Sequence, residues 1–273
     1  MKEKILSAME SPLLVGVVTE KTPEAAIAEI QNCTYNGAQM IDLHLSCLED
    51  TDDARLKRLF DLSRLPVLAV NYDLTYERQP RNYTEEQRTG MLLKAVELGA
   101  AGVDIQGYTF HLPSKTEFCG EDKYSFTKNN PKEVVTDPVI IDKQKAFIEE
   151  VHAKGGEVLL SCHPDIPMNS TQVVELALFL EERHPDIIKV VTIATNEEEL
   201  IESFKAMSLL KKEVKTKVSY HVGGPMGSLS RIVNPALGGH MIFCVDRFNA
   251  GSTMFQLDLK TAKNIVDNIK KIK

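Results

Sequence analysis

The sequence has few of the features that mark a secreted, membrane-bound or nucleic-acid-binding protein. Its 5 cysteines in 273 residues are widely spaced and include no C-x-x-C pair, which argues against a disulfide framework and against a zinc site. No run approaches the roughly 18 apolar residues of a membrane span, and the first residues do not resemble a signal peptide. A net charge of -7 argues against binding to nucleic acid or to anionic lipid. We therefore expect a cytoplasmic protein whose partner is a small molecule, with no membrane or nucleic-acid partner.

Short runs rich in Val and Ile alternate with longer amphipathic segments, a pattern typical of repeated βα units around a parallel sheet. Helix start signals support the alternation, such as Thr22 before Pro23 and the TEEQ sequence that begins at Thr84. Eight strands are predicted, at residues 13–18, 40–45, 66–71, 102–106, 157–162, 187–193, 217–222 and 241–245. The pattern predicts one α/β domain over residues 1–273, a single (β/α)8 TIM barrel. An open doubly wound sheet is the alternative.

The connection after the fourth predicted strand is much longer than the others. Residues 107–141 contain few periodic apolar positions, and loops of this length are usually functional or disordered. In a barrel, a loop that follows a strand projects from the face on which active sites are built. We predict a lid over the site, with a surface excursion or an oligomer contact as the alternatives.

Lys189 interrupts the apolar run of the sixth predicted strand, IIKVVTI. Alternate residues of a barrel strand point inward, and a lysine there has to be solvated by a polar site or become neutral. The neutral amine is a nucleophile that condenses with a ketone or an aldehyde to form a Schiff base. The alternative is a lysine whose side chain reaches solvent at the bottom of the barrel.

Further polar residues follow the neighbouring strands. His163 comes directly after the fifth strand, where a histidine can take a proton from carbon and return it to oxygen; a structural role is the alternative. A glycine-rich segment leads to Arg231 after the seventh strand, and this combination suits a carboxylate or a phosphate. A tight turn with a surface arginine is the alternative there. His221, at the end of the seventh strand, can face the site or pack in the core.

The sequence resembles the type I 3-dehydroquinate dehydratase family, the Schiff-base barrels of the shikimate pathway. The resembling motifs are Ser161-Cys162-His163, Asp186-Ile187-Ile188-Lys189, the run Gly224, Gly227, Ser230 and Arg231, and the pair Ser252 and Gln256. The resemblance implies that Lys189 forms an imine with the substrate ketone. It implies that His163 removes the adjacent carbon proton and then protonates the departing hydroxyl. By the same resemblance, Arg231 binds the substrate carboxylate, and Ser252 and Gln256 belong to a loop that closes over the substrate.

The N-terminal half departs from the family. The family has Glu-x-Arg in its second strand, and this chain has Asp42 and His44 at those positions. The family's third-strand arginine aligns with Asn71, and Glu77 is the nearest counterpart of the acid that orients the catalytic histidine. We take these four residues as further substrate-binding candidates. The differences make a changed or larger substrate plausible.

The prediction is therefore a lyase that eliminates water from a cyclic carboxylated ketone such as 3-dehydroquinate, using Lys189 and His163 and no cofactor. One alternative is a class I aldolase that acts on a sugar phosphate, with phosphate bound by the glycine-rich loop. Another is a barrel that has lost catalysis and keeps a binding role. Asp42, His44 and His111 also allow a metal site, but their spacing is unspecific, and we predict none. The resemblance implies a homodimer.

Overall fold

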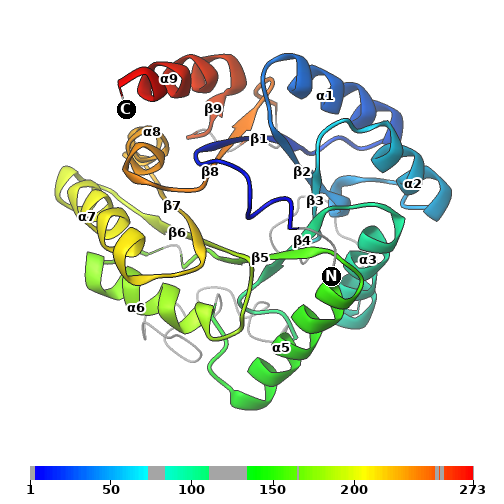
Figure 1. Ribbon diagram of the computed structural model, residues 1–273, viewed down its shortest axis with the longest axis horizontal. Helices are drawn as coiled ribbons and strands as arrows, with labels where there is room; N and C mark the ends of the chain where they lie inside the picture. The colour runs from blue at the N-terminus through cyan, green and yellow to red at the C-terminus, as the bar shows by residue number, and fades with distance from the viewer. Residues whose placement is uncertain are drawn as a thin grey trace. The chain divides into compact units, whose positions relative to one another are not determined.

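Parallel strands and helices alternate along the described residues of the computed structural model, which are 4–72, 84–110, 134–164, 166–249, 252 and 255–272 (Figure 1). The strands are β1 Leu13–Val18, β2 Met40–His44, β3 Val67–Val70, β4 Gly102–Gln106, β5 Glu157–Cys162, β6 Ile187–Ile193, β7 Lys217–Gly223, β8 Met241–Val245 and the short β9 Leu257–Asp258. The helices are α1 Pro23–Tyr35, α2 Asp53–Leu62, α3 Glu85–Leu98, α5 Pro138–Ala153, α6 Ser170–Glu181, α7 Glu197–Glu213, α8 Gly227–Leu237 and α9 Leu259–Ile272, with a 3-10 turn, η1, at Leu45–Cys47. Each of the predicted strands is present, and the predicted βα alternation is confirmed.

The helix starts follow the local signals in the sequence. The hydroxyl of Thr22 accepts a hydrogen bond from the backbone of α1, and Pro23 occupies the first turn. Thr84 and Gln87 form a complete capping box at the start of α3. Helix α5 begins at Pro138, within the connection predicted at residues 107–141, because Asp137 accepts a hydrogen bond from the backbone N–H of Val139 at 2.8 Å and starts the helix earlier.

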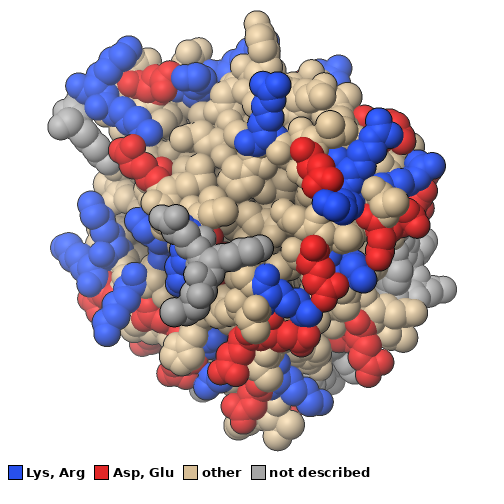
Figure 2. All heavy atoms as spheres, turned by 45° about the vertical axis from the view of Figure 1, so that its right-hand side comes forward, with Lys and Arg blue, Asp and Glu red and all other residues tan. Residues whose placement is uncertain are grey.

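The chain divides into two compact units. The first comprises Met1–Asp104, Val151–Glu157 and Ile242–Lys273, and the second comprises Ile105–Glu150 and Val158–Met241. The single domain over residues 1–273 stays a prediction. Within the described residues no helix is both long and apolar enough to cross a bilayer. Acidic and basic side chains are interspersed over the face that Figure 2 shows.

In the first unit, β1, β2, β3 and the part of β4 up to Asp104 form a parallel sheet whose two faces have different neighbours. A Cβ added to Gly16 would lie 2.8 Å from two atoms of Cys33 in α1, so the Gly16 face is the helix-covered one. Gly16 is in register with Ile41, and the next pair is Val17 with Asp42. Because side chains alternate along a strand, Asp42 lies on the face away from the helices.

In the second unit, β5, β6 and β7 are parallel neighbours, and α8 packs against β7. Buried Arg183 fixes the described ends of the long connection, since its guanidinium donates to the Val135 carbonyl at 2.9 Å and to Gln144 at 2.7 Å. Gln144 in turn donates to the carbonyls of Gly107 and Thr109. Burial lowers the pKa of Arg183 to about 10. The predicted lid lies for the most part at residues 111–133, outside the described residues.

Candidate active site

Lys189 lies in the middle of β6 and only 6% of it is exposed. The strand around it is built from β-branched residues that favour extended backbone. In the sheet register Lys189 pairs with Ser161 of β5 and with Ser219 of β7. Both serines are fully buried, and residues in register share a face of the sheet. The structure therefore buries the lysine between two small polar residues, rather than leaving its side chain in solvent.

His221 lies on the same face of the sheet as Lys189. It pairs with Val191, which is two residues beyond Lys189 on β6, so the alternation of side chains returns to the face of the lysine. His221 is 5% exposed. His163 directly follows the last residue of β5 and is partly buried. His221 thus lies in the carboxyl-terminal half of β7, and His163 lies directly beyond the carboxyl end of β5. These two strands flank β6, which carries Lys189.

The pKa of His221 reflects its burial and the charged groups around it. It lies well below its ordinary value of 6.5, because burial disfavours the charged imidazolium. The further causes, in order, are the positive charges of Arg231, Lys189 and His163. We call these four residues, Lys189, His163, Arg231 and His221, the lysine cluster. The structure brings together the three predicted members, and His221 is neutral among them near pH 7.

Helix α8 holds Arg231 in the cluster through the other residues of its motif. Gly224 has a φ of +78°, and a Cβ there would lie 2.8 Å from the Ala194 carbonyl oxygen, so the turn requires glycine. The Ser230 hydroxyl accepts from the backbone N–H of Val222 at 3.0 Å and donates to the Gly227 carbonyl at 2.8 Å. These bonds fix the first turn of α8 on the end of β7. Arg231, the next residue, is 6% exposed.

Asp42 and His44 form a pair in the first unit. Oδ2 of Asp42 lies 3.4 Å from Nε2 of His44, and both residues project from the same face of β2 because they are two positions apart. The His44 ring also contacts Tyr72, with 5.6 Å between ring centroids. Asp42 is buried and His44 is partly exposed. The pair can hold a polar substrate group or orient a proton on the imidazole.

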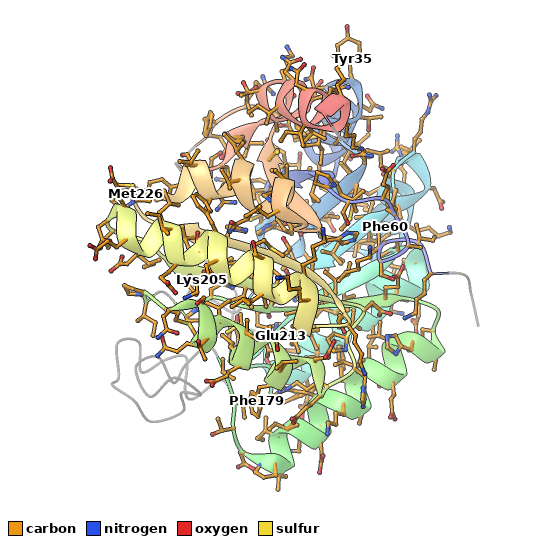
Figure 3. The ribbon with its side chains drawn as sticks, turned by 60° about the vertical axis from the view of Figure 1, so that its left-hand side comes forward. Tyr35, Phe60, Phe179, Lys205, Glu213 and Met226 are labelled. Carbon is orange, nitrogen blue, oxygen red and sulfur yellow. The ribbon has the colours of Figure 1, made fainter. Side chains whose placement is uncertain are left out.

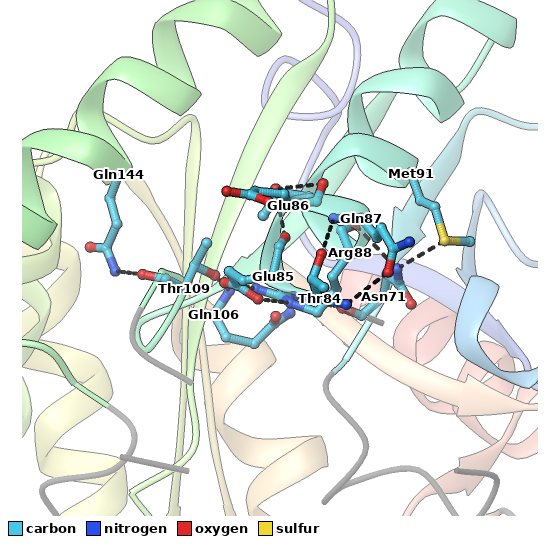
Figure 4. A network of polar contacts seen from close by, with 11 residues as sticks. Asn71, Thr84, Glu85, Glu86, Gln87, Arg88, Met91, Gln106, Thr109 and Gln144 are labelled. Carbon is cyan, nitrogen blue, oxygen red and sulfur yellow. Dashed lines mark hydrogen bonds and ion pairs between the residues drawn. The ribbon is translucent and has the colours of Figure 1, made fainter. Parts of the chain in front are cut away.

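Asn71 lies elsewhere, because its side chain points to helix α3. Its amide donates to the Arg88 carbonyl at 3.2 Å and contacts the Met91 sulfur. Figure 4 shows Asn71 beside these two residues. The Arg88 guanidinium donates back to the Asn71 carbonyl at 2.7 Å. Asn71 is fully buried. The structure thus does not bring Asn71 together with Asp42 and His44, and Glu77 lies outside the described residues.

Ser252 and Gln256 line a small polar pocket of the first unit, which also includes Glu29, Arg247 and Asn249. The Ser252 hydroxyl accepts from the backbone N–H of Asn249 at 2.9 Å and lies 3.2 Å from its side-chain oxygen. Oε2 of Glu29 and Nη2 of Arg247, two of the lining residues, are 3.5 Å apart. The two predicted residues therefore share one pocket that suits a polar ligand group.

The described residues contain no group of three or more His, Cys, Asp or Glu side chains arranged to hold a metal ion. His111, one of the three residues considered for a metal, lies outside them. The sequence left the role of His221 open because a lone histidine near a strand end is an unspecific signal. Its face becomes known only from the register of β7 with β6, in which His221 pairs with Val191, two residues beyond Lys189.

Comparisons with known proteins give one family and a set of similar folds. The family model described as type I 3-dehydroquinase matches residues 15–273. No curated protein matches this chain by sequence. The model covers both units and all four motifs of the sequence.

Solved structures resemble the chain over nearly its whole length. The type I 3-dehydroquinate dehydratase from Clostridium difficile with covalent modified comenic acid has a TM-score of 0.74 at 14% identity, and the match covers 97% of this chain and 95% of that one. The 3-dehydroquinate dehydratase from Geobacillus kaustophilus HTA426 has a TM-score of 0.77 at 12% identity, covering 96% and 92%. The enzyme from Enterococcus faecalis has a TM-score of 0.72 at 15% identity, covering 97% and 98%. At such identities the likeness shows the fold, and the predicted α/β TIM-barrel class is confirmed.

Proposed function

The chain belongs to the type I 3-dehydroquinase family, and we propose that it eliminates water from 3-dehydroquinate, or from a closely similar carboxylated cyclic ketone, through an imine on Lys189. Membership of this family makes the chain a hydro-lyase, so the proposal concerns the substrate and the mechanism. The observation that supports it most is the lysine cluster, in which the buried amine of Lys189, the guanidinium of Arg231 and the imidazole of His163 all act on His221. The match to a structure with covalent modified comenic acid agrees with covalent chemistry in this fold.

Lys189 performs the covalent step in this mechanism. Its uncharged amine adds to the substrate ketone, and loss of water from the adduct leaves a protonated imine. The positive nitrogen withdraws electrons from the neighbouring carbon and stabilises the charge that develops when a proton leaves it. Hydrolysis of the imine after the elimination returns the amine and releases the product. Burial in β6 protects the amine from solvent during these steps.

His163 moves the proton of the elimination. As a neutral base it takes the proton from the carbon next to the imine, and as an acid it gives that proton to the departing hydroxyl, which leaves as water. The imidazole ends the cycle as it began. A positioned acid–base group of this kind contributes about 10² to 10⁴ to the rate. The position of His163 directly after β5, and its charge effect on His221, agree with this role.

Arg231 is proposed to bind the substrate carboxylate. A guanidinium can hold a carboxylate with two parallel hydrogen bonds, which fixes orientation as well as charge. The residue is buried, and α8 is pinned to β7 by Ser230, so the guanidinium has a defined position. The negative substrate also offsets the positive charge of the cluster when the imine forms.

The remaining candidates are assigned from the family motifs. We propose that Ser252, Gln256, Asp42 and His44 contact the substrate, and Glu77 stays a prediction outside the described residues. Asn71 is left out, because its amide is bonded to α3. We also propose a homodimer in the cytoplasm, which sedimentation of the purified protein and cell fractionation would test.

Trapping with borohydride tests the mechanism. The protein is incubated with 3-dehydroquinate and reduced, so that hydride adds to the imine carbon and leaves a stable secondary amine, which peptide mass spectrometry then locates. We expect the adduct on Lys189 in the wild type and its loss in Lys189→Met. Lys205→Met is the matched control, since Lys205 is an exposed lysine on α7 (Figure 3). An adduct with a sugar phosphate and none with 3-dehydroquinate would support the aldolase alternative instead.

A further inference from the structure

His221 has no task in the mechanism above, although it lies within the lysine cluster. It occupies β7, the neighbour of the strand that holds Lys189, and it projects from the same face of the sheet. Its side chain is 5% exposed. The charges that act on it come from three different elements, with Arg231 on α8, Lys189 on β6 and His163 after β5. Each of these neighbours has a proposed part in binding or catalysis.

The sheet geometry puts His221 beside the place where a substrate attached to Lys189 would lie. His221 is one strand across from Lys189 and two residues further toward the carboxyl ends of the strands. With about 4.8 Å between strands and about 3.3 Å per residue, the two backbones are roughly 8 Å apart at these positions. A lysine side chain covers most of such a step, and the charge of Lys189 does act on His221. A ring bonded to the lysine nitrogen would therefore meet the imidazole.

The charge state of His221 limits what it can recognise. The site already contains the guanidinium of Arg231 and gains the positive charge of the protonated imine. A second permanent cation next to that imine would disfavour its formation. A neutral imidazole has one donor and one acceptor nitrogen, which suits an uncharged hydroxyl better than a carboxylate.

We infer that His221 is a substrate-binding residue, which exchanges a hydrogen bond with a hydroxyl group on the ring that is attached to Lys189. The ligand class is a hydroxylated cyclic ketone, whose carboxylate goes to Arg231 and whose ring hydroxyl goes to His221. This inference rests on the proposed function, because it needs the substrate to be attached to Lys189. It assigns the two imidazoles different tasks, with His163 moving protons and His221 selecting the substrate.

Two variants and two substrates test the inference. His221→Leu keeps a side chain of similar size and removes both polar nitrogens, whereas His221→Gln keeps a donor and an acceptor. Each is compared with the wild type on 3-dehydroquinate and on an analogue that lacks one ring hydroxyl but keeps the hydroxyl that departs as water. We expect His221→Leu to lower kcat/KM for the hydroxylated ketone about 10- to 100-fold, since a buried hydroxyl loses its partner. On the matching deoxy analogue, the wild type and His221→Leu should have equal kcat/KM.

Rescue by glutamine separates binding from packing. We expect His221→Gln to stay within about threefold of the wild type, because the amide can replace the hydrogen bond. Equal losses for leucine and glutamine, or equal losses on both substrates, would overturn the inference. If His221→Leu does not fold, His221→Gln still tests the inference. The ratio of kcat/KM on 3-dehydroquinate to kcat/KM on the deoxy analogue should be similar in His221→Gln and in the wild type. Loss of this preference in His221→Gln would contradict the role. Absence of any adduct on Lys189 of the wild type would instead overturn the proposed function itself.

Discussion

The second unit gathers three ionisable side chains around the buried amine of Lys189, whereas in the first unit Asp42 pairs with His44 and Asn71 turns to a helix. In the second unit the charges of Arg231, Lys189 and His163 all act on His221. In the first unit Asp42 contacts His44, and Asn71 is bonded to α3. Both units are built from the same parallel βα repeat. The repeat therefore does not by itself decide where polar groups meet.

The difference depends on the residues that hold each side chain in place. Arg231 is positioned by a glycine turn and by the Ser230 bonds to β7 and the start of α8. Lys189 is held within a buried strand between neighbours in register. Asn71 immediately follows β3, and its side chain lies on the helix-covered face. A position in a motif is thus more informative than the alignment of a lone polar residue.

The largest expected effect is that of Lys189→Met on turnover. Methionine keeps an unbranched side chain of similar length, and it has no amine that can form an imine. We expect kcat/KM to fall about 10⁴-fold or more, because the covalent route is lost. Measurement of substrate loss with and without Lys205→Met as the control checks this. Turnover near the wild-type rate in Lys189→Met would place the chemistry outside the lysine cluster.

His163→Ala sharpens the comparison within the second unit. Without the proton carrier, the imine should still form slowly on Lys189, and the elimination should slow about 10²- to 10⁴-fold. Borohydride trapping during turnover should then show more adduct in the variant than in the wild type. A variant that eliminates water at the normal rate would move the acid–base role to another residue, with His221 as the first to examine.

The fold was predictable from the sequence because strand and helix signals alternate without a break. The stretches at 187–193 and 241–245 are apolar runs of strand length, and they occur as β6 and β8. The two residues of β9 carry no such period and were not predicted. The early start of α5 was missed because it depends on one capping contact from Asp137.

The residues of the candidate site were predictable only where they belong to a sequence motif that determines the local backbone conformation. Lys189, His163 and Arg231 were expected together and do act on the same imidazole. Asn71 is the first residue after β3, and the face of the sheet from which its side chain projects depends on the alternation along that strand. Its direction depends also on the position of Arg88 in α3. That information is tertiary, and a single residue in a sequence does not contain it. The same holds for His221, whose face is set by the register of β7 with β6.

Asn71→Ala tests whether this polar residue of the first unit stabilises the fold without binding substrate. The variant removes the hydrogen bond to the Arg88 carbonyl in a fully buried place, so the free energy of unfolding should fall by about 1 to 2 kcal/mol. We expect kcat/KM to stay within about twofold of the wild type, since the amide faces α3. Urea unfolding and steady-state kinetics measure the two effects. A tenfold loss of kcat/KM in a stable variant would return Asn71 to the substrate site.

A pH dependence of stability should arise from His221. Its folded pKa is lowered by burial and then by Arg231, Lys189 and His163, so below about pH 6.5 the unfolded chain binds a proton that the folded chain does not. The stability contributed by this group is therefore complete above pH 6.5 and falls as the pH drops, by up to about 1.4 kcal/mol per pH unit. The difference in unfolding free energy between the wild type and His221→Gln should therefore fall by up to about 2 kcal/mol between pH 6.5 and pH 5. His184→Asn, at an exposed position with a φ of 58° that asparagine tolerates, controls for the loss of a histidine elsewhere in the same unit. A difference that stays constant over this range would show that His221 takes up a proton in the folded protein, and the lysine cluster would then lack its neutral member.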